Sequence, residues 1–199
     1  MGAATIVIAL IGLSVAAFGG GSHPVALAAA AGESKGGAVS AESSLHSAGA
    51  IYTDGFQNGW TDWSWVKDRD VADRQHARPG GAGVCVRLHG GGFAGFFPRS
   101  DAFDVTPYDR LFFRASGGAV GGQSLKISGL RKDKPQGGTF VGPLSANHWK
   151  AIAIALQTLK VTGSKDVTGF WFQIYSQGDS PEFYVEDIRL LHAGEPAPQ

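Results

Sequence analysis

Apolar and polar residues alternate with a period of two at several places between residues 84 and 190. Because successive side chains of a strand point to opposite faces of a sheet, this pattern is typical of strands with one face on a core. Glycine-rich turn signals separate the alternating segments, and no stretch keeps a long helical period. The segments are Val84–Leu88, Arg110–Ala115, Leu125–Ser128, Trp149–Leu156, Phe170–Tyr175 and Phe183–Leu190.

Many short alternating strands predict an all-β fold, a two-sheet antiparallel β-sandwich of the jelly-roll kind. The 30 glycines agree with this prediction, because they are about twice the usual share of roughly 7% and form short runs between segments. The stretches 89–107 and 131–147 lack the alternation, and we expect them to be loops.

Aromatic residues recur at positions that the alternation assigns to the outside of the sandwich. In Phe170–Tyr175 the outward set is Trp171, Gln173 and Tyr175, and in Arg110–Ala115 it includes Phe112. Aromatic rings beside hydrogen-bonding side chains indicate a binding surface. A loop that covers this face would bury the same residues instead. The predicted ligand-binding residues are Asp62, Arg87, Phe112, Arg114, Lys126, Trp171, Gln173 and Tyr175.

Three of the five tryptophans lie close together at Trp60, Trp63 and Trp65. In a regular strand Trp63 and Trp65 share one face and Asp62 lies on the other. Paired tryptophans at this spacing more often belong to a core, so we expect both rings inside. The alternative is that they face a ligand. The core interpretation places Asp62 on the ligand face and Trp60 near the edge.

The two ends of the chain differ from its middle. The uncharged apolar run 6–18 and the alanine-rich tract 26–31 predict a signal peptide over 1–31, although neither Lys nor Arg precedes the run. We expect a flexible linker at 32–48, the folded domain at 49–192 and a disordered tail at 193–199. The protein is therefore expected to be secreted, and no later apolar run is long enough for a membrane span.

Charge and cysteine content exclude several classes of function. Lys plus Arg and Asp plus Glu each number 17, so the chain lacks the basic excess that nucleic acid binding favours. Cys85 is the single cysteine and cannot form a disulfide within the chain. Its position between two valines predicts a small, partly buried side chain rather than a nucleophile.

Four stretches together resemble the galactose-binding-like jelly rolls, which include non-catalytic carbohydrate-binding modules of secreted glycoside hydrolases. They are IYTDGFQNGWTDWSW (51–65), YDRLFFRASGG (108–118), GFWFQIYSQG (169–178) and EFYVEDIRLL (182–191). The resemblance implies saccharide binding without catalysis, on the concave sheet or at its loop edge. It also implies a structural calcium between the first strand and the last, for which Asp54 and Asp187 are the matching acids.

These observations predict a secreted, lectin-like protein that binds a poly- or oligosaccharide. An aromatic ring can lie against the apolar face of a pyranose while polar side chains bond its hydroxyl groups. Two alternatives stay open. One is a small secreted jelly-roll polysaccharide lyase or glycoside hydrolase, and the other is an adhesion domain that docks a protein through the same face.

Overall fold

Twelve β-strands form two antiparallel sheets in the computed structural model, which describes residues 48–198. The predicted signal peptide and, apart from Ala48, the predicted linker lie outside the described residues. Sheet A has the order β10 (Trp149–Ala155), β7 (Tyr108–Ser116), β12 (Ser180–His192), β4 (Cys85–Gly90) and β3 (Asp68–Asp73), with β1 (Ala50–Tyr52) also paired to β12. Sheet B has the order β2 (Thr61–Asp62), β6 (Pro98–Phe103), β11 (Val167–Ile174), β8 (Leu125–Arg131) and β9 (Lys134–Val141), with β5 (Gly95–Phe96) also paired to β11.

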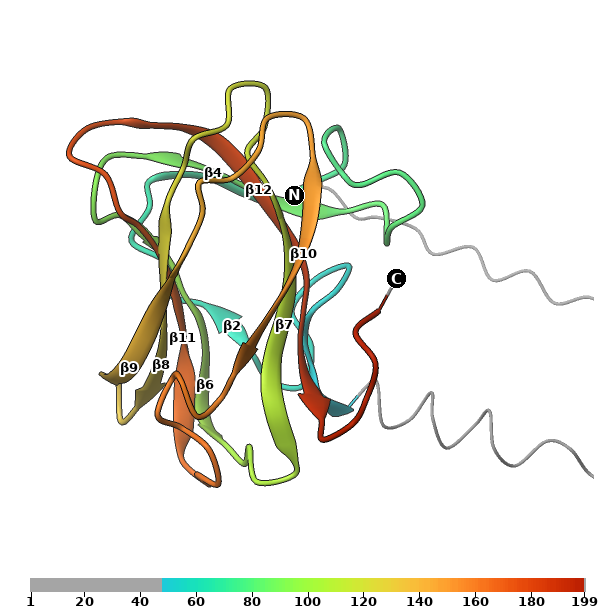
Figure 1. Cartoon of the computed structure of the whole chain (residues 1–199), viewed down its shortest axis with the longest axis vertical. Coiled ribbons are helices and arrows are strands. Elements are labelled where there is room, and N and C mark those ends of the chain that lie inside the picture. Colours follow the sequence, from blue (N-terminus) through green and yellow to red (C-terminus); the bar gives the residue numbers. More distant parts are fainter. Residues whose placement is uncertain (1–47, 199) are drawn as a thin grey trace, which may run out of the picture. The chain divides into compact units, whose positions relative to one another are not determined.

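The two sheets face each other as layers with the hydrophobic core between them (Figure 1). Strands β11 and β12 follow each other in the chain, yet each lies in the middle of a different sheet. Phe172 of β11 meets Phe113 of β7 across the core, with ring centroids 4.9 Å apart and planes at 82°. Burial of each such ring stabilises the fold by about 1.5–3 kcal/mol. The predicted all-β sandwich is confirmed.

The alternation correctly assigns the inward residues of the main strands. Val84, Val86 and Leu88 of one segment belong to the core, as do Phe170 and Phe172 of another. Cys85 points away from this core but is fully buried, and burial raises the pKa of its thiol to about 12. The thiol therefore stays protonated at neutral pH, which agrees with a structural rather than a nucleophilic cysteine.

Strands β5, β6 and β9 lie in the stretches that we expected to be loops. The reason is clearest for β9, an edge strand whose residues are all exposed or half-buried. It contains Pro135 and the pair Gly137-Gly138, which edge strands tolerate because one side makes no ladder bonds. An edge strand with so little buried surface shows no apolar alternation. Within residues 48–198 no helix has the length and hydropathy that crossing a membrane requires.

Candidate functional site: an aromatic face on sheet B

The outer face of sheet B combines polar and aromatic side chains in rows that run across the strands. Gln173 of β11, Lys126 of β8 and Phe140 of β9 are successive cross-strand neighbours. In the next row Trp171 of β11 lies opposite Ser128 of β8. Trp171, Gln173 and Lys126 are half-buried, whereas Phe140 is exposed. Three predicted ligand-binding residues are thus brought together here.

Trp63 and Trp65 also lie on this outer face, so the expectation that they fill the core is wrong. Their backbone amides donate to the carbonyl oxygens of Phe97 and Gly95, at 2.9 and 3.0 Å, which extends the sheet beyond β2. Trp63 is 59% exposed and Trp65 is 41% exposed. Trp60, expected near the edge, is 3% exposed and belongs to the core.

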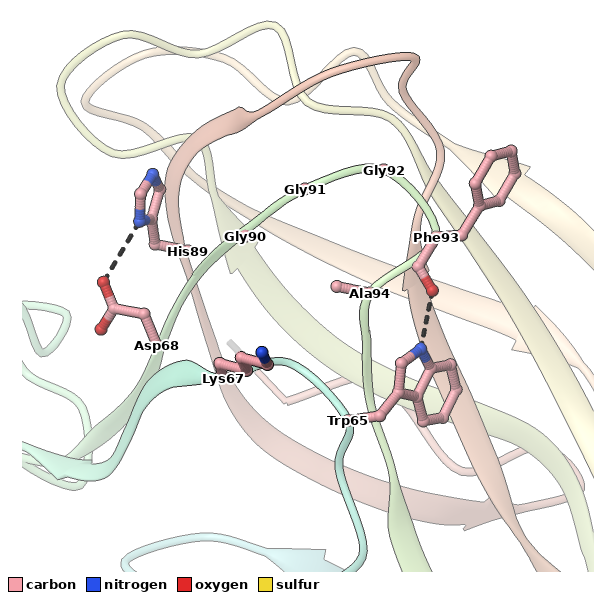
Figure 2. Close-up of a pocket in the computed structure, with 9 residues that line it drawn as sticks. All are labelled: Trp65, Lys67, Asp68, His89, Gly90, Gly91, Gly92, Phe93 and Ala94. Atoms are coloured by element: carbon pink, nitrogen blue, oxygen red, sulfur yellow. Dashed lines mark hydrogen bonds and ion pairs between the residues drawn. The ribbon is translucent and has the colours of Figure 1, made fainter.

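Several contacts fix the position of Trp65. Its ring packs edge-on against Trp171, with centroids 5.3 Å apart and planes at 76°. Its Nε1 donates to the carbonyl oxygen of Phe93 at 2.7 Å (Figure 2). A Cβ atom on Gly95 would lie 2.4 Å from the indole, so the ring can rest on the sheet there only because residue 95 is a glycine. The indole is therefore held in one orientation before any ligand binds.

Phe93 connects this tryptophan pair with a second group of rings. It has φ 68°, a left-handed conformation that non-glycine residues rarely adopt, and its carbonyl accepts from both Trp65 and Gln173. Its own ring meets Tyr175 edge-on at 5.8 Å, and Tyr175 meets Phe140 at 4.8 Å. We call Trp63, Trp65, Phe93, Phe140, Trp171 and Tyr175 the aromatic face.

A cation lies at the Trp63 end of this face. The guanidinium carbon of Arg99 is 4.2 Å from the centroid of the Trp63 ring, within the range of a cation–π contact. Arg99 is itself held by Asp133 and Asp101, whose carboxylate oxygens lie 3.1 and 2.9 Å from its nitrogens. These bonds keep the cation against one side of the indole and limit the freedom of the exposed ring.

A hollow of about 430 Å³ adjoins the aromatic face beside Trp65 and Phe93 (Figure 2). Its far side is formed by Lys67, Asp68 and His89, and Asp68 Oδ2 lies 3.1 Å from His89 Nδ1. A hydrogen bond from Arg87 and the contact with His89 lower the pKa of the Asp68 carboxyl, so it is ionised at neutral pH. The hollow therefore places charged groups at one end of the aromatic face.

The remaining predicted residues lie elsewhere. Tyr175 is on the aromatic face and 48% exposed, but Arg87, Phe112 and Arg114 belong to sheet A on the opposite side of the sandwich. Phe112 is fully buried and Arg114 is 6% exposed, with its guanidinium 5.4 Å from the Phe112 ring. At this part of sheet A the outward side chains are therefore buried, as the alternative interpretation of a covered face expected.

Asp62 points away from the aromatic face and joins the two sheets. Its carboxylate accepts from the Ser64 backbone amide at 2.9 Å, from the Ser64 hydroxyl and from Arg69 Nε of β3 at 2.7 Å. Burial alone would raise the pKa of Asp62, but these hydrogen bonds and the Arg69 charge outweigh it and hold the pKa below its ordinary value. The carboxylate is thus used within the fold.

This depressed pKa predicts a loss of stability in acid. A carboxyl with a lowered folded pKa stabilises the fold above its ordinary pKa of about 3.9 and loses that contribution as pH falls through the folded value. We expect Asp62→Asn to lower the free energy of unfolding at pH 7 by about 1–2 kcal/mol and to flatten its decline below pH of about 4. Urea unfolding at a series of pH values measures both effects.

The control for this experiment is Asp179→Asn, which removes an exposed carboxyl and should change the free energy of unfolding at pH 7 by less than about 0.5 kcal/mol. If the Asp62 variant loses stability in acid as steeply as the unmodified protein, the bond between the sheets is not the titrating contact.

The predicted calcium residues make other contacts in the structure. Asp54 is exposed and accepts from Thr53 Oγ1 and Gln57 Nε2, each at 3.1 Å. Asp187 accepts from Arg189 Nε at 2.7 Å and lies 3.7 Å from Arg114 Nε. Among residues 48–198 no group of three or more His, Cys, Asp or Glu side chains is placed to hold a metal ion. Two guanidinium groups beside Asp187 do not suit a cation, and calcium stays a prediction that a metal titration would test.

Sequence reasoning missed Trp63, Trp65, Phe93 and Phe140 as members of this face. The tryptophans show a usable signal, since a strand that buries Trp60 and Val66 on one side must expose positions 63 and 65 on the other. Phe93 and Phe140 lie in segments without alternation, so the sequence holds no comparable signal for them.

Comparison with known proteins supports the fold. No family model matches the chain. An endoglucanase of Dictyostelium discoideum is 26% identical over 148 residues, which are 70% of this chain and 20% of that protein. The chain thus spans about a fifth of the length of this curated relative.

Solved structures of carbohydrate-binding modules have the same fold. The family 30 carbohydrate-binding module of a cellulosomal cellulase of Clostridium thermocellum has a TM-score of 0.53 and 14% identity, covering 73% of this chain and 98% of the module. A variant of a family 29 carbohydrate-binding module has a TM-score of 0.51 and 13% identity, with 75% and 96% covered. The predicted resemblance to the β-sandwich of carbohydrate-binding modules is confirmed at the level of the fold.

Proposed function

We propose that this protein is a non-catalytic carbohydrate-binding module that holds a polysaccharide chain along the aromatic face. The observation that carries the proposal is the set of six rings on the outer side of sheet B, five of which are 41–59% exposed. All but Trp63 are joined by ring contacts or through the Phe93 carbonyl. A contiguous exposed apolar surface on a small domain marks a binding site. The fold shared with carbohydrate-binding modules supports the same conclusion.

The chemistry of the face suits a neutral polymer of sugars. Each pyranose ring has an apolar side that can stack on an indole or phenyl ring, and hydroxyl groups that Gln173 and Lys126 can bond. The face extends from the β2 side to β9, which is four strand spacings or roughly 19 Å. That length accommodates several sugar units in a row rather than one.

The ligand class that we propose is a β-linked glucan in the extracellular space. The endoglucanase relative and the cellulase that contains the family 30 module favour a glucan over other polymers. The signal peptide predicted over residues 1–31 favours secretion. Stacking of two or three rings with a few hydrogen bonds gives an affinity of about micromolar to millimolar per site.

Depletion from solution tests this proposal. The purified protein is mixed with washed cellulose, chitin, β-1,3-glucan and xylan, and the protein left in solution is measured as the polymer is increased. We expect saturable loss on cellulose or β-1,3-glucan, and soluble glucan oligosaccharides should reverse it.

Three results would contradict the proposal. Retention on none of the four polymers would remove the aromatic face as a polysaccharide site. Release of reducing ends or unsaturated products would show a hydrolase or a lyase. Binding to a cell-surface extract that sugars do not compete away would favour protein docking instead.

A further inference from the structure

A second hollow lies on the outer face of sheet A, on the opposite side of the sandwich from the aromatic face. Its volume of about 450 Å³ is in the range of about 300–1,000 Å³ that small-molecule pockets occupy. The register explains how it arises: Trp149 of β10, Ser116 of β7 and Tyr184 of β12 are neighbours in one row across the strands. The small, buried Ser116 between two large rings leaves the space open.

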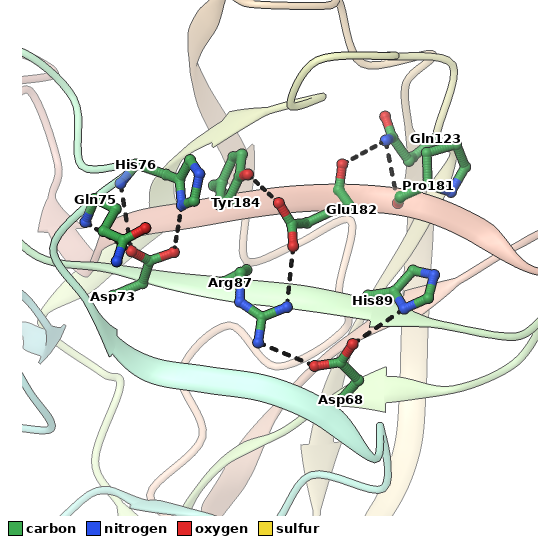
Figure 3. A network of polar contacts seen from close by, with 10 residues as sticks. All are labelled: Asp68, Asp73, Gln75, His76, Arg87, His89, Gln123, Pro181, Glu182 and Tyr184. Atoms are coloured by element: carbon green, nitrogen blue, oxygen red, sulfur yellow. Dashed lines mark hydrogen bonds and ion pairs between the residues drawn. The ribbon is translucent and has the colours of Figure 1, made fainter.

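Hydrogen bonds fix the loops around this hollow. Gln123 Nε2 donates to the carbonyl oxygens of Gly117 and Glu182 at 3.0 and 2.9 Å, as Figure 3 shows for the second bond. The backbone amide of Asn147 donates to the carbonyl of Gly118 at 2.6 Å. Gly118 has φ 60°, and a Cβ atom there would lie 2.6 Å from the Glu182 carbonyl oxygen, so glycine permits this approach. The hollow is therefore formed before a ligand arrives.

One wall of the hollow is aromatic. The imidazole of His76 stacks on the ring of Tyr184, with centroids 4.7 Å apart and planes at 15°, and the Trp149 ring lies 6.4 Å from Tyr184. Asp73 Oδ2 is 2.7 Å from His76 Nδ1 and holds the imidazole in this orientation (Figure 3). Tyr184 is only 6% exposed and supports the other two rings, so the exposed His76 and the half-buried Trp149 offer the aromatic surface to a ligand.

Glu182 at the hollow shares its cation with a second carboxylate, because Arg87 pairs with both Glu182 and Asp68. Glu182 accepts from the Tyr184 hydroxyl and from Arg87 Nη1 at 3.0 Å (Figure 3). Burial alone would raise the pKa of Glu182, but these two hydrogen bonds lower it, so the carboxylate is ionised and paired with Arg87. Such a carboxylate can still accept a hydrogen bond from a hydroxyl group of a ligand.

Polar side chains complete the lining. Within residues 48–198 the structure gives no protein partner to the side-chain amides of Gln75 and Asn147 or to Trp149 Nε1, all of which line the hollow. Amides can both donate and accept, which is what a hydroxyl group requires. The lining therefore provides hydrogen-bonding groups that the fold itself does not use.

We propose that this hollow is a second carbohydrate site, which binds a free mono- or disaccharide or the end of a sugar chain. Aromatic walls, unused amides and a carboxylate that accepts hydrogen bonds suit a neutral ring rich in hydroxyl groups, and the volume suits one or two units. The proposal rests on residues of sheet A and is independent of the aromatic face. With both sites occupied, one molecule would hold two glycans and gain avidity on a surface.

Nuclear magnetic resonance with isotope-labelled protein tests the proposal, using glucose, galactose, cellobiose and xylobiose as probes. The unmodified protein is compared with the double variant Trp63→Ala/Trp65→Ala, in which the aromatic face is disabled. We expect the indole N–H of Trp149 and the side-chain amides of Gln75 and Asn147 to shift in both proteins. The dissociation constant with at least one probe should be about 0.1–10 mM.

Variants in the hollow sharpen this test. Trp149→Ala should weaken binding at the hollow by roughly tenfold or more. Asn147→Gly removes the amide but keeps the left-handed backbone at φ 52°, so it should weaken binding without unfolding the loop. Gln157→Ala removes an exposed amide on the turn after β10 and should change nothing.

The proposal is overturned if no probe shifts these three side chains. It is also overturned if every shift disappears in the Trp63→Ala/Trp65→Ala protein. Shifts at the hollow without retention on any polysaccharide would support the second site while contradicting the function proposed for the aromatic face.

Discussion

Trp65→Ala is expected to weaken binding to the retained polysaccharide by a factor of about 5–30, which corresponds to roughly 1–2 kcal/mol. The change removes one stacking surface and the partner against which Trp171 packs edge-on. It also removes one of the two donors to the Phe93 carbonyl, so the left-handed conformation at Phe93 loses part of its support. Titration calorimetry with soluble glucan oligosaccharides or retention in a polysaccharide gel measures the change.

The matched control is Val120→Ala, an apolar side chain that is 70% exposed and lies outside both proposed sites. It should bind as the unmodified protein does. Trp65→Phe keeps an aromatic surface but loses the Nε1 donor, so its affinity should fall between the two. A folded Trp65→Ala protein with undiminished affinity would show that the ligand does not contact this face.

Arg78→Met is expected to lower the free energy of unfolding by about 3–5 kcal/mol. Glu186 is a buried carboxylate on sheet A, only 2% exposed, and it accepts from Arg78 Nε at 2.7 Å and from the Arg78 backbone amide at 3.3 Å. Arg114 lies opposite Glu186 in the register, but its guanidinium bonds Pro198 and approaches Asp187 instead. Loss of the Arg78 guanidinium would therefore leave a buried charge without its main partner.

Urea unfolding measures this effect, with Arg74→Met as control. Arg74 is exposed in the same connection between β3 and β4, so its replacement should change stability by less than about 0.5 kcal/mol. The double variant Arg78→Met/Glu186→Gln should recover part of the loss, because it removes the unpaired charge. A loss of under about 1 kcal/mol in the single variant would mean that water or Arg114 compensates Glu186.

The two predictions concern opposite sides of the sandwich. The bond between Arg78 and Glu186 ties the connection 74–84 to sheet A, and Gln75 and His76 of the same connection line the second hollow. A protein weakened at Arg78 should therefore lose the second site before it loses the aromatic face, which depends on Trp65, Phe93 and the strands of sheet B.

The sequence by itself determined the fold class and the inward side of the main strands. Period-two alternation suffices for this, because the backbone sends neighbouring side chains to opposite faces whatever else surrounds them. Phe170, Phe172 and Ile174 are in the core for that reason, and Trp171, Gln173 and Tyr175 lie together on the other side.

Only the tertiary structure decided which outward residues meet and which are covered. Trp63 and Trp65 face outward because Trp60 and Val66 fill the core and Gly95 leaves room for an indole. Phe112 and Arg114 also point outward from their strand, yet they are buried, and the Arg114 guanidinium bonds the chain end at Pro198. Alternation along one strand predicts the face of the sheet on which each side chain lies. Whether that side chain is exposed depends on contacts with segments far away in the sequence.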